Sequence, residues 1–137
     1  MGDTGLACAL LGLDAARLKH DRQTTGQMLE TFVLQELRRQ ASGRPEPLSF
    51  LHYRDRDDFE VDIVIERGAS AVAGVEVKAA ASVSEHDLRG LRKLRESAGT
   101  RFVRGVILYD GGATIDFGGR LQAVPIRALW EPEPGRP

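Results

Sequence analysis

Ionisable residues recur in two β-branched segments of the sequence, at a spacing suited to hydrolytic chemistry. Asp62 lies in one segment, and Glu76 and Lys78 lie in the other. Side chains alternate between the faces of a strand, so Glu76 and Lys78 are expected to share a face. Because Asp62 and Glu76 are equally far along the chain from Ala69, a symmetric hairpin around Ala69 would place their carboxylates opposite each other. The pattern therefore predicts two facing carboxylates with a lysine beside them.

Facing carboxylates repel each other unless a cation lies between them. Hard divalent ions bind to one or two carboxylates together with water and substrate phosphates. We therefore predict a Mg²⁺ or Mn²⁺ site with Asp62 and Glu76 as ligands. A bound metal ion generates hydroxide from its water, and Lys78 would hold the attacking water or offset charge on the phosphate. Asp62, Glu76 and Lys78 are accordingly the predicted catalytic residues for hydrolysis of phosphodiesters, with DNA as the expected substrate.

The helices that must support these residues are visible in the apolar pattern. From residue 24 or 25 to residue 40, apolar residues follow helical spacing, with Thr24 as the expected N-cap. A further helix is predicted from the capping box of Ser84 and Asp87 to about residue 97. Its apolar residues lie along one edge, and its other face is basic.

Strands are predicted at 48–53, 61–66, 72–78 and 102–109, and a hairpin at 113–126. The connection between the first two strands is charged and has no glycine to fix its turn type. The connection between the second and third strands is short, which makes these strands antiparallel. The predicted order of helix, three strands, helix and further strands is that of an α/β domain.

The composition indicates a folded globular protein. The chain has 137 residues, a net charge of −1, and 42% hydrophobic and 28% charged residues. Near-neutral charge is not the signature of a dedicated nucleic-acid binder, so any phosphate binding must be local. Cys8 is the single cysteine, which excludes an internal disulfide and a thiolate zinc site built from this chain. No apolar run suits a membrane span or a secretory signal, so we expect no membrane partner and a cytoplasmic location.

We predict one domain over residues 1–130, followed by a proline-rich, disordered tail over residues 131–137. Within it, residues 4–13 suit a short amphipathic helix. The apolar start of the chain suggests that residues 1–20 are a remnant of a preceding region. Trp130 is expected to be a core or domain-contact residue.

Asp62, the segment Glu76-Val77-Lys78 and Glu30 on the preceding helix together resemble the PD-(D/E)XK nuclease superfamily. The resemblance implies a restriction-endonuclease-like α/β fold, in which helices flank a central mixed β-sheet. It also implies that the aspartate and glutamate ligate Mg²⁺ or Mn²⁺, that the lysine assists the water, and that Glu30 is an auxiliary metal ligand. Val61 stands where the superfamily's name has proline, a position that the superfamily keeps loosely.

A longer similarity extends over nearly the whole chain. The segments that carry it are 3–6, 26–30, 32–33, 36–37, 53–54, 60–62, 74–78, 87–91, 105–111 and 124–130. They resemble the C-terminal domain of uncharacterised prokaryotic AAA-type ATPases, a domain of unknown function. The resemblance implies an AAA-type ATPase region as the partner in family relatives. This chain has no Gly-rich loop ending in Lys-Ser or Lys-Thr, so we expect no ATPase activity of its own.

Simpler interpretations compete with these assignments. The acidic residues and the lysine of the two strands would equally form a solvated sheet face with a cross-strand salt bridge. Glu30 would then be an exposed residue favoured by the dipole at its helix N-terminus. The basic residues around Arg89 and Lys93 would be a solvated helix face and not a contact to DNA phosphates. His52 is expected to be structural or solvated.

A second functional hypothesis is a catalytically silent module that docks an ATPase, a DNA end or another copy of itself. The near-neutral net charge favours it. A homodimer would use the apolar first segment around Leu6, Leu10 and Leu11. The sequence leaves cleavage and docking open.

Overall fold

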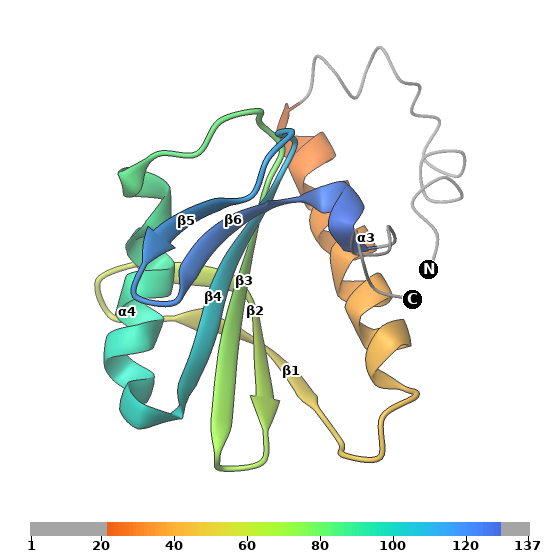
Figure 1. Cartoon of the computed structure of the whole chain (residues 1–137), viewed down its shortest axis with the longest axis vertical. Helices are drawn as coiled ribbons and strands as arrows, with labels where there is room; N and C mark the ends of the chain where they lie inside the picture. The colour runs from red at the N-terminus through yellow and green to blue at the C-terminus, as the bar shows by residue number, and fades with distance from the viewer. Residues whose placement is uncertain (1–21, 130–137) are drawn as a thin grey trace.

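The computed structural model describes residues 22–129, in which helices lie on both sides of a β-sheet (Figure 1). Helix α3 (Arg22–Ala41) and helix α4 (Arg89–Ala98) cover opposite faces of the sheet. The strands are β1 (Ser49–Arg54), β2 (Glu60–Arg67), β3 (Ala71–Lys78), β4 (Phe102–Tyr109), β5 (Ile115–Gly118) and β6 (Leu121–Pro125). Short 3-10 helices are η1 (Glu85–Leu88), η2 (Gly99–Arg101) and η3 (Ile126–Leu129).

The sheet has six strands in the order β1-β2-β3-β4-β6-β5. β1, β2 and β3 form an antiparallel meander, as their short connections predict. β3 and β4 are parallel because α4 carries the chain back along the sheet between them, and β6 joins β4 in parallel. β5 pairs with β6 in the predicted hairpin at 113–126, through a bend at Gly118 and Gly119, which both have positive φ. The prediction of an α/β fold with a central mixed sheet between helices is confirmed.

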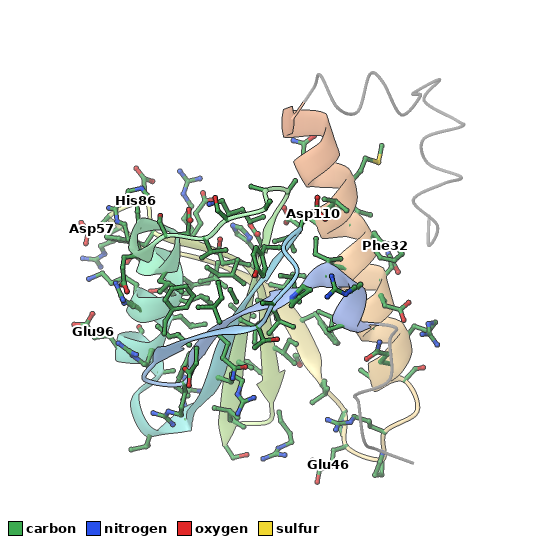
Figure 2. The ribbon with its side chains drawn as sticks, turned by 45° about the horizontal axis from the view of Figure 1, so that its top comes forward. Phe32, Glu46, Asp57, His86, Glu96 and Asp110 are labelled. Atoms are coloured by element: carbon green, nitrogen blue, oxygen red, sulfur yellow. The ribbon has the colours of Figure 1, made fainter. Side chains whose placement is uncertain are left out.

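Each face of the sheet has its own apolar core. On the α4 side the buried residues are Val61, Val64, Val72, Leu88, Leu91, Leu94, Phe102, Ile107, Tyr109, Leu121 and Ala123. On the α3 side they are Val33, Ile63, Val75 and Leu108. Figure 2 shows His86 and Glu96 on the side of the molecule where α4 lies, and Phe32 on α3. No polar or charged residue of the described part is fully buried, so the ionisable residues of interest lie at the margins of these cores.

The two helix starts predicted from the sequence have different outcomes. α3 is already helical at Arg22, so Thr24 lies inside the helix and the prediction of an N-cap there was wrong. A capping side chain contributes only about 1 kcal/mol, and a helix extends past such a signal when the preceding residues also favour helix. The capping box at the second helix is confirmed, because the Ser84 backbone N–H donates to the Asp87 carboxylate at 2.8 Å.

The charged connection between β1 and β2 turns without glycine. Asp58 has a φ of 61°, in the left-handed region where aspartate is better tolerated than most residues. The Asp55 carboxylate accepts hydrogen bonds from the backbone N–H groups of Asp57 and Phe59 at 2.9 and 3.0 Å. These bonds fix the turn that delivers Phe59 to the start of β2.

β2 is irregular next to Asp62. Leu51 pairs with Val64, and Tyr53 pairs with Val61, so β2 has one more residue than β1 over this stretch. Such a β-bulge bends the strand locally and redirects the side chains beside it. Asp62 therefore does not lie in a regular part of the ladder between β1 and β2.

The bulge changes which residues of β2 share a face. Val61 and Val64 both pack into the core on the α4 side, whereas Ile63 and Ile65 pack on the α3 side. Strict alternation along β2 predicts that Val61 shares a face with Ile63 and Ile65, and this prediction is wrong. The extra residue near Asp62 interrupts the period of two on which the prediction depends.

None of the helices within residues 22–129 is long and apolar enough to cross a membrane. Several predictions concern residues outside the described range. They are the amphipathic helix with Leu6, Leu10 and Leu11, the contact made by Trp130, and the disordered tail over residues 131–137. The assignment of a single domain over residues 1–130 also stays a prediction.

Candidate functional site

Asp62 and Glu76 come together where β2 begins and β3 ends. Ile63 pairs with Val75, which makes Asp62 and Glu76 the next positions along the two strands. The backbone N–H of Val77 donates to the Asp62 carboxylate at 2.8 Å. The backbone N–H of Asp62 in turn donates to the Glu76 carboxylate. The structure thus brings the two predicted carboxylates together, and each is held by the backbone of the opposite strand.

The surroundings of this carboxylate pair oppose its ionisation. Burial, followed by the charge of Asp62, raises the pKa of Glu76 to about 8. Burial likewise raises the pKa of Asp62, although the hydrogen bond from Val77 partly offsets the effect. The pair therefore accommodates its full negative charge poorly unless a cation neutralises it.

Glu30 lies on α3, within electrostatic range of this site. Burial raises the pKa of Glu30 most, and the charge of Asp62 raises it further, so the two carboxylates lie within electrostatic reach. The helix containing Glu30 begins at Arg22, and its described first turn holds no acidic residue. The helix dipole favours acidic residues only in the first turn. Glu30 lies beyond that turn of α3, so the dipole does not explain an acidic residue at this position.

His52 lies beside this acidic site on β1. Its Nδ1 atom is 3.4 Å from the backbone carbonyl oxygen of Asp62. Its charge also lowers the pKa values of Asp62 and Glu30, in opposition to the larger effect of burial. No local pattern in the sequence predicts this position of His52, because the contact crosses from β1 to the bulge of β2.

Lys78 follows Glu76 on the same face of β3, but its ammonium group is engaged elsewhere. Its Nζ atom lies 2.5 Å from Oδ2 of Asp87. Burial is the largest single influence on the pKa of Asp87 and raises it. Hydrogen bonds from Lys78 and Ser84 together outweigh burial and hold this pKa below its usual value. Among the ion pairs of residues 22–129, none joins Lys78 to Asp62 or Glu76. The cross-strand salt bridge of the simpler interpretation is therefore not formed.

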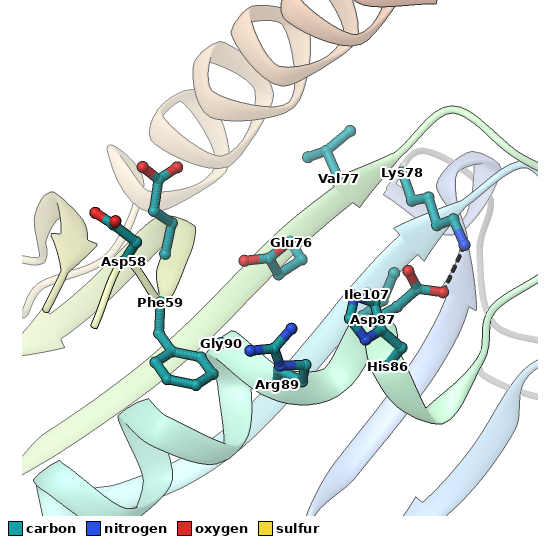
Figure 3. Close-up of a pocket in the computed structure, with 11 residues that line it drawn as sticks. Asp58, Phe59, Glu76, Val77, Lys78, His86, Asp87, Arg89, Gly90 and Ile107 are labelled. Carbon is teal, nitrogen blue, oxygen red and sulfur yellow. Dashed lines mark hydrogen bonds and ion pairs between the residues drawn. The ribbon is translucent and has the colours of Figure 1, made fainter.

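Glu76, Lys78 and Asp87 line one pocket of about 310 Å³ (Figure 3). Phe59 and Arg89 form another part of its wall. Figure 3 shows the Lys78 side chain turned toward Asp87, while Glu76 points to the other end of the pocket. The predicted acidic residue and lysine thus share a cavity without touching.

Gly90, near the start of α4, permits the close approach that shapes this pocket. A Cβ atom at this position would lie 2.0 Å from the backbone carbonyl oxygen of Glu60 and 3.3 Å from Oε1 of Glu76. A side chain there would force α4 away from β2. Sequence reasoning did not assign Gly90 or Asp87 to the site. The capping box marked the helix start at Asp87, but nothing local indicated its contact with Lys78.

The donor atoms fit a hard divalent cation held by two carboxylates. Asp62 and Glu76 supply oxygen atoms whose burial and mutual repulsion a cation would relieve. Over the described range 22–129, no three His, Cys, Asp or Glu side chains gather closely enough to hold a metal ion by themselves. Mg²⁺ is commonly bound in this way, because it keeps several waters and takes further ligands from substrate phosphates.

Comparison with known proteins gives a family match. The family model described as "Domain of unknown function (DUF4143)" matches residues 25–129. No curated protein matches the chain. One matching solved structure is the refined half-complex from a tetradecameric assembly of Thermococcus gammatolerans McrB AAA+ hexamers with bound McrC. The sequence identity is 17% and the TM-score is 0.49, and the match covers 73% of this chain and 27% of that chain.

Proposed function

The chain belongs to the family described as Domain of unknown function (DUF4143), and we propose from its own site that it is a divalent-metal-dependent nuclease domain that hydrolyses DNA phosphodiesters. The observation that carries the proposal is the pairing of Asp62 and Glu76. These carboxylates are partly buried and bonded to each other's strands, and their ionised forms are disfavoured. Burying acidic groups together costs free energy without a compensating cation, which argues for a metal role over a purely structural one.

Each residue of the site has a role in this proposal. Asp62 and Glu76 hold Mg²⁺ or Mn²⁺, and Glu30 is an auxiliary ligand from α3 that must move closer to the pair, because the three carboxylates do not form a metal-binding cluster within residues 22–129. The metal ion, when bound, supplies hydroxide from its water and neutralises charge on the phosphate. Lys78 offsets the negative charge that develops on the phosphate. To do so it must exchange its contact with Asp87 for the substrate, because both acceptors need the same ammonium group.

The restriction-endonuclease-like identity of the fold is part of the same proposal. The order of α3, the meander that bears Asp62, Glu76 and Lys78, and the parallel strand β4 supports it. A cytoplasmic location, where the domain has access to DNA, is also proposed.

Two measurements test the proposal. Calorimetric titration with Mn²⁺ measures metal binding, and a plasmid-nicking assay then measures DNA cleavage. Wild type should bind Mn²⁺ and nick the plasmid, whereas Asp62→Asn and Glu76→Gln should lose metal binding. Lys78→Ala should keep metal binding and lose nicking. Glu96→Gln is the matched control, because Glu96 is exposed on α4. Nicking that persists unchanged in Asp62→Asn and Lys78→Ala would rule out these assignments.

A catalytically silent docking module is a second candidate, favoured by the engagement of Lys78 with Asp87. A lysine held by a carboxylate at 2.5 Å is not free to act on a phosphate. The partner would then be the AAA-type ATPase region that the sequence resemblance implies, or a second copy of the chain. Metal binding and nicking would both be absent, and complex formation or dimerisation, measured by light scattering, would not depend on divalent ions.

A further inference from the structure

Two basic side chains of α4 lie over one aromatic ring at the wall of the pocket. The Arg89 Cζ atom is 4.8 Å and the Lys93 Nζ atom 5.4 Å from the centroid of the Phe59 ring. Phe59 lies immediately before β2, and Figure 3 shows Arg89 beside it. We refer to Phe59, Arg89 and Lys93 as the stacked cation cluster. Phe59 and Arg89 line the same pocket as Glu76, so the cluster borders the proposed metal centre.

The charge of this cluster is not balanced within the described part of the chain. Among the ion pairs of residues 22–129, none includes Arg89 or Lys93. The other acidic residues of the pocket wall contact basic side chains outside the cluster: Asp58 and Glu60 share Arg54, and Asp87 pairs with Lys78. Glu76 remains, and it is the proposed metal ligand. Arg89 and Lys93 therefore carry positive charge at the edge of the pocket that no ion pair among residues 22–129 offsets.

The stacking leaves the donors of the cluster available for an anion. A guanidinium group that packs its flat face on a ring keeps its N–H groups free at the edge, where they bind two oxygen atoms of a phosphate. Contact with Phe59 also restricts the long side chains, so less conformational entropy is lost when a ligand binds. Arg89 and Lys93 are one helical turn apart, about 5.4 Å. One DNA strand carries a phosphate for about every 3.4 Å of helix axis, so two phosphates of one strand lie within reach.

We propose that the stacked cation cluster binds the phosphodiester backbone of DNA at the strand that enters the proposed metal centre. The inference rests on the proposed function, which makes DNA the partner. Arg89 and Lys93 supply affinity and register on the strand without reading its sequence. Phe59 braces both side chains.

Fluorescence anisotropy of a labelled DNA duplex with the full chain, at several salt concentrations, tests the inference. EDTA in the buffer prevents metal-dependent cleavage. Arg89→Gln and Lys93→Gln should each weaken binding and reduce the slope of log affinity against log salt by about 0.9, the value for one lost phosphate contact. The double variant should reduce the slope by about 1.8. Arg92→Gln is the control on the same helix, because Arg92 is already paired with Glu85.

A further variant tests the bracing role of the ring. Phe59→Leu keeps an apolar side chain but removes the aromatic face, so it should weaken DNA binding less than the double variant does. Circular dichroism of each variant checks that the fold is retained.

The outcomes separate this inference from the nuclease proposal. Weaker DNA binding and a smaller salt slope in the Arg89→Gln and Lys93→Gln variants, measured in EDTA, would support the role of the cluster. This would hold even if the wild type neither bound Mn²⁺ nor nicked the plasmid. An unchanged slope in the double variant would overturn the inference, and so would an equal loss in Arg92→Gln. Absence of DNA binding by the wild type would overturn it as well, whatever the calorimetry of Mn²⁺ shows.

Discussion

Glu76 should make the folded chain less stable as the pH rises. Burial and the charge of Asp62 raise the pKa of Glu76 from 4.5 to about 8. A carboxyl group with a higher pKa in the folded state contributes its full stability below pH 4.5, and that contribution is lost as the pH rises through about 8. At about 1.4 kcal/mol for each pH unit in this window, the loss reaches about 5 kcal/mol at most. Burial raises the pKa of Asp62 too, so Asp62 acts in the same direction.

Urea unfolding between about pH 5 and about pH 9 measures this effect. Glutamine at position 76 still accepts the hydrogen bond from Asp62 but does not ionise, so Glu76→Gln should lose most of the decline in unfolding free energy. Glu96→Gln should decline as the wild type does, because Glu96 is exposed. At alkaline pH, saturating Mg²⁺ should raise the unfolding free energy of the wild type but not that of Glu76→Gln. Equal declines in the wild type and Glu76→Gln would refute this reasoning.

Two further predictions concern the elements that hold the site. Asp87→Asn should lower the unfolding free energy by about 1 kcal/mol. It should also speed the acylation of Lys78, measured by mass spectrometry with Lys93 as the internal control. An unchanged acylation rate of Lys78 would argue against the ion pair. Gly90→Ala should cost about 2 kcal/mol in urea unfolding, because its Cβ would lie 2.0 Å from a backbone oxygen. Gly43→Ala, with nothing within 4 Å, should be nearly neutral, and equal costs at both positions would contradict the packing argument.

The sequence by itself determined the elements and much of the pairing of the sheet. Helical spacing marked α3, alternation and β-branched residues marked β1 to β4, and the capping box of Ser84 and Asp87 marked the second helix. These signals are local, because each depends on residues a few positions apart. The short hairpin between β2 and β3 likewise fixed the register that brings Asp62 next to Glu76. The sequence therefore also determined that this pair of carboxylates meets.

Only the tertiary structure decided what surrounds that pair. The bulge at Asp62 arises from the different lengths of β1 and β2 over the same stretch, so Val61 faces α4 against the alternation of its own strand. The partner of Lys78 is Asp87, which α4 and η1 bring back over the end of β3. The elevated pKa of Glu76 depends on burial and on neighbours from other elements. Contacts between distant segments have no period in the sequence, because they form only when the layers pack together.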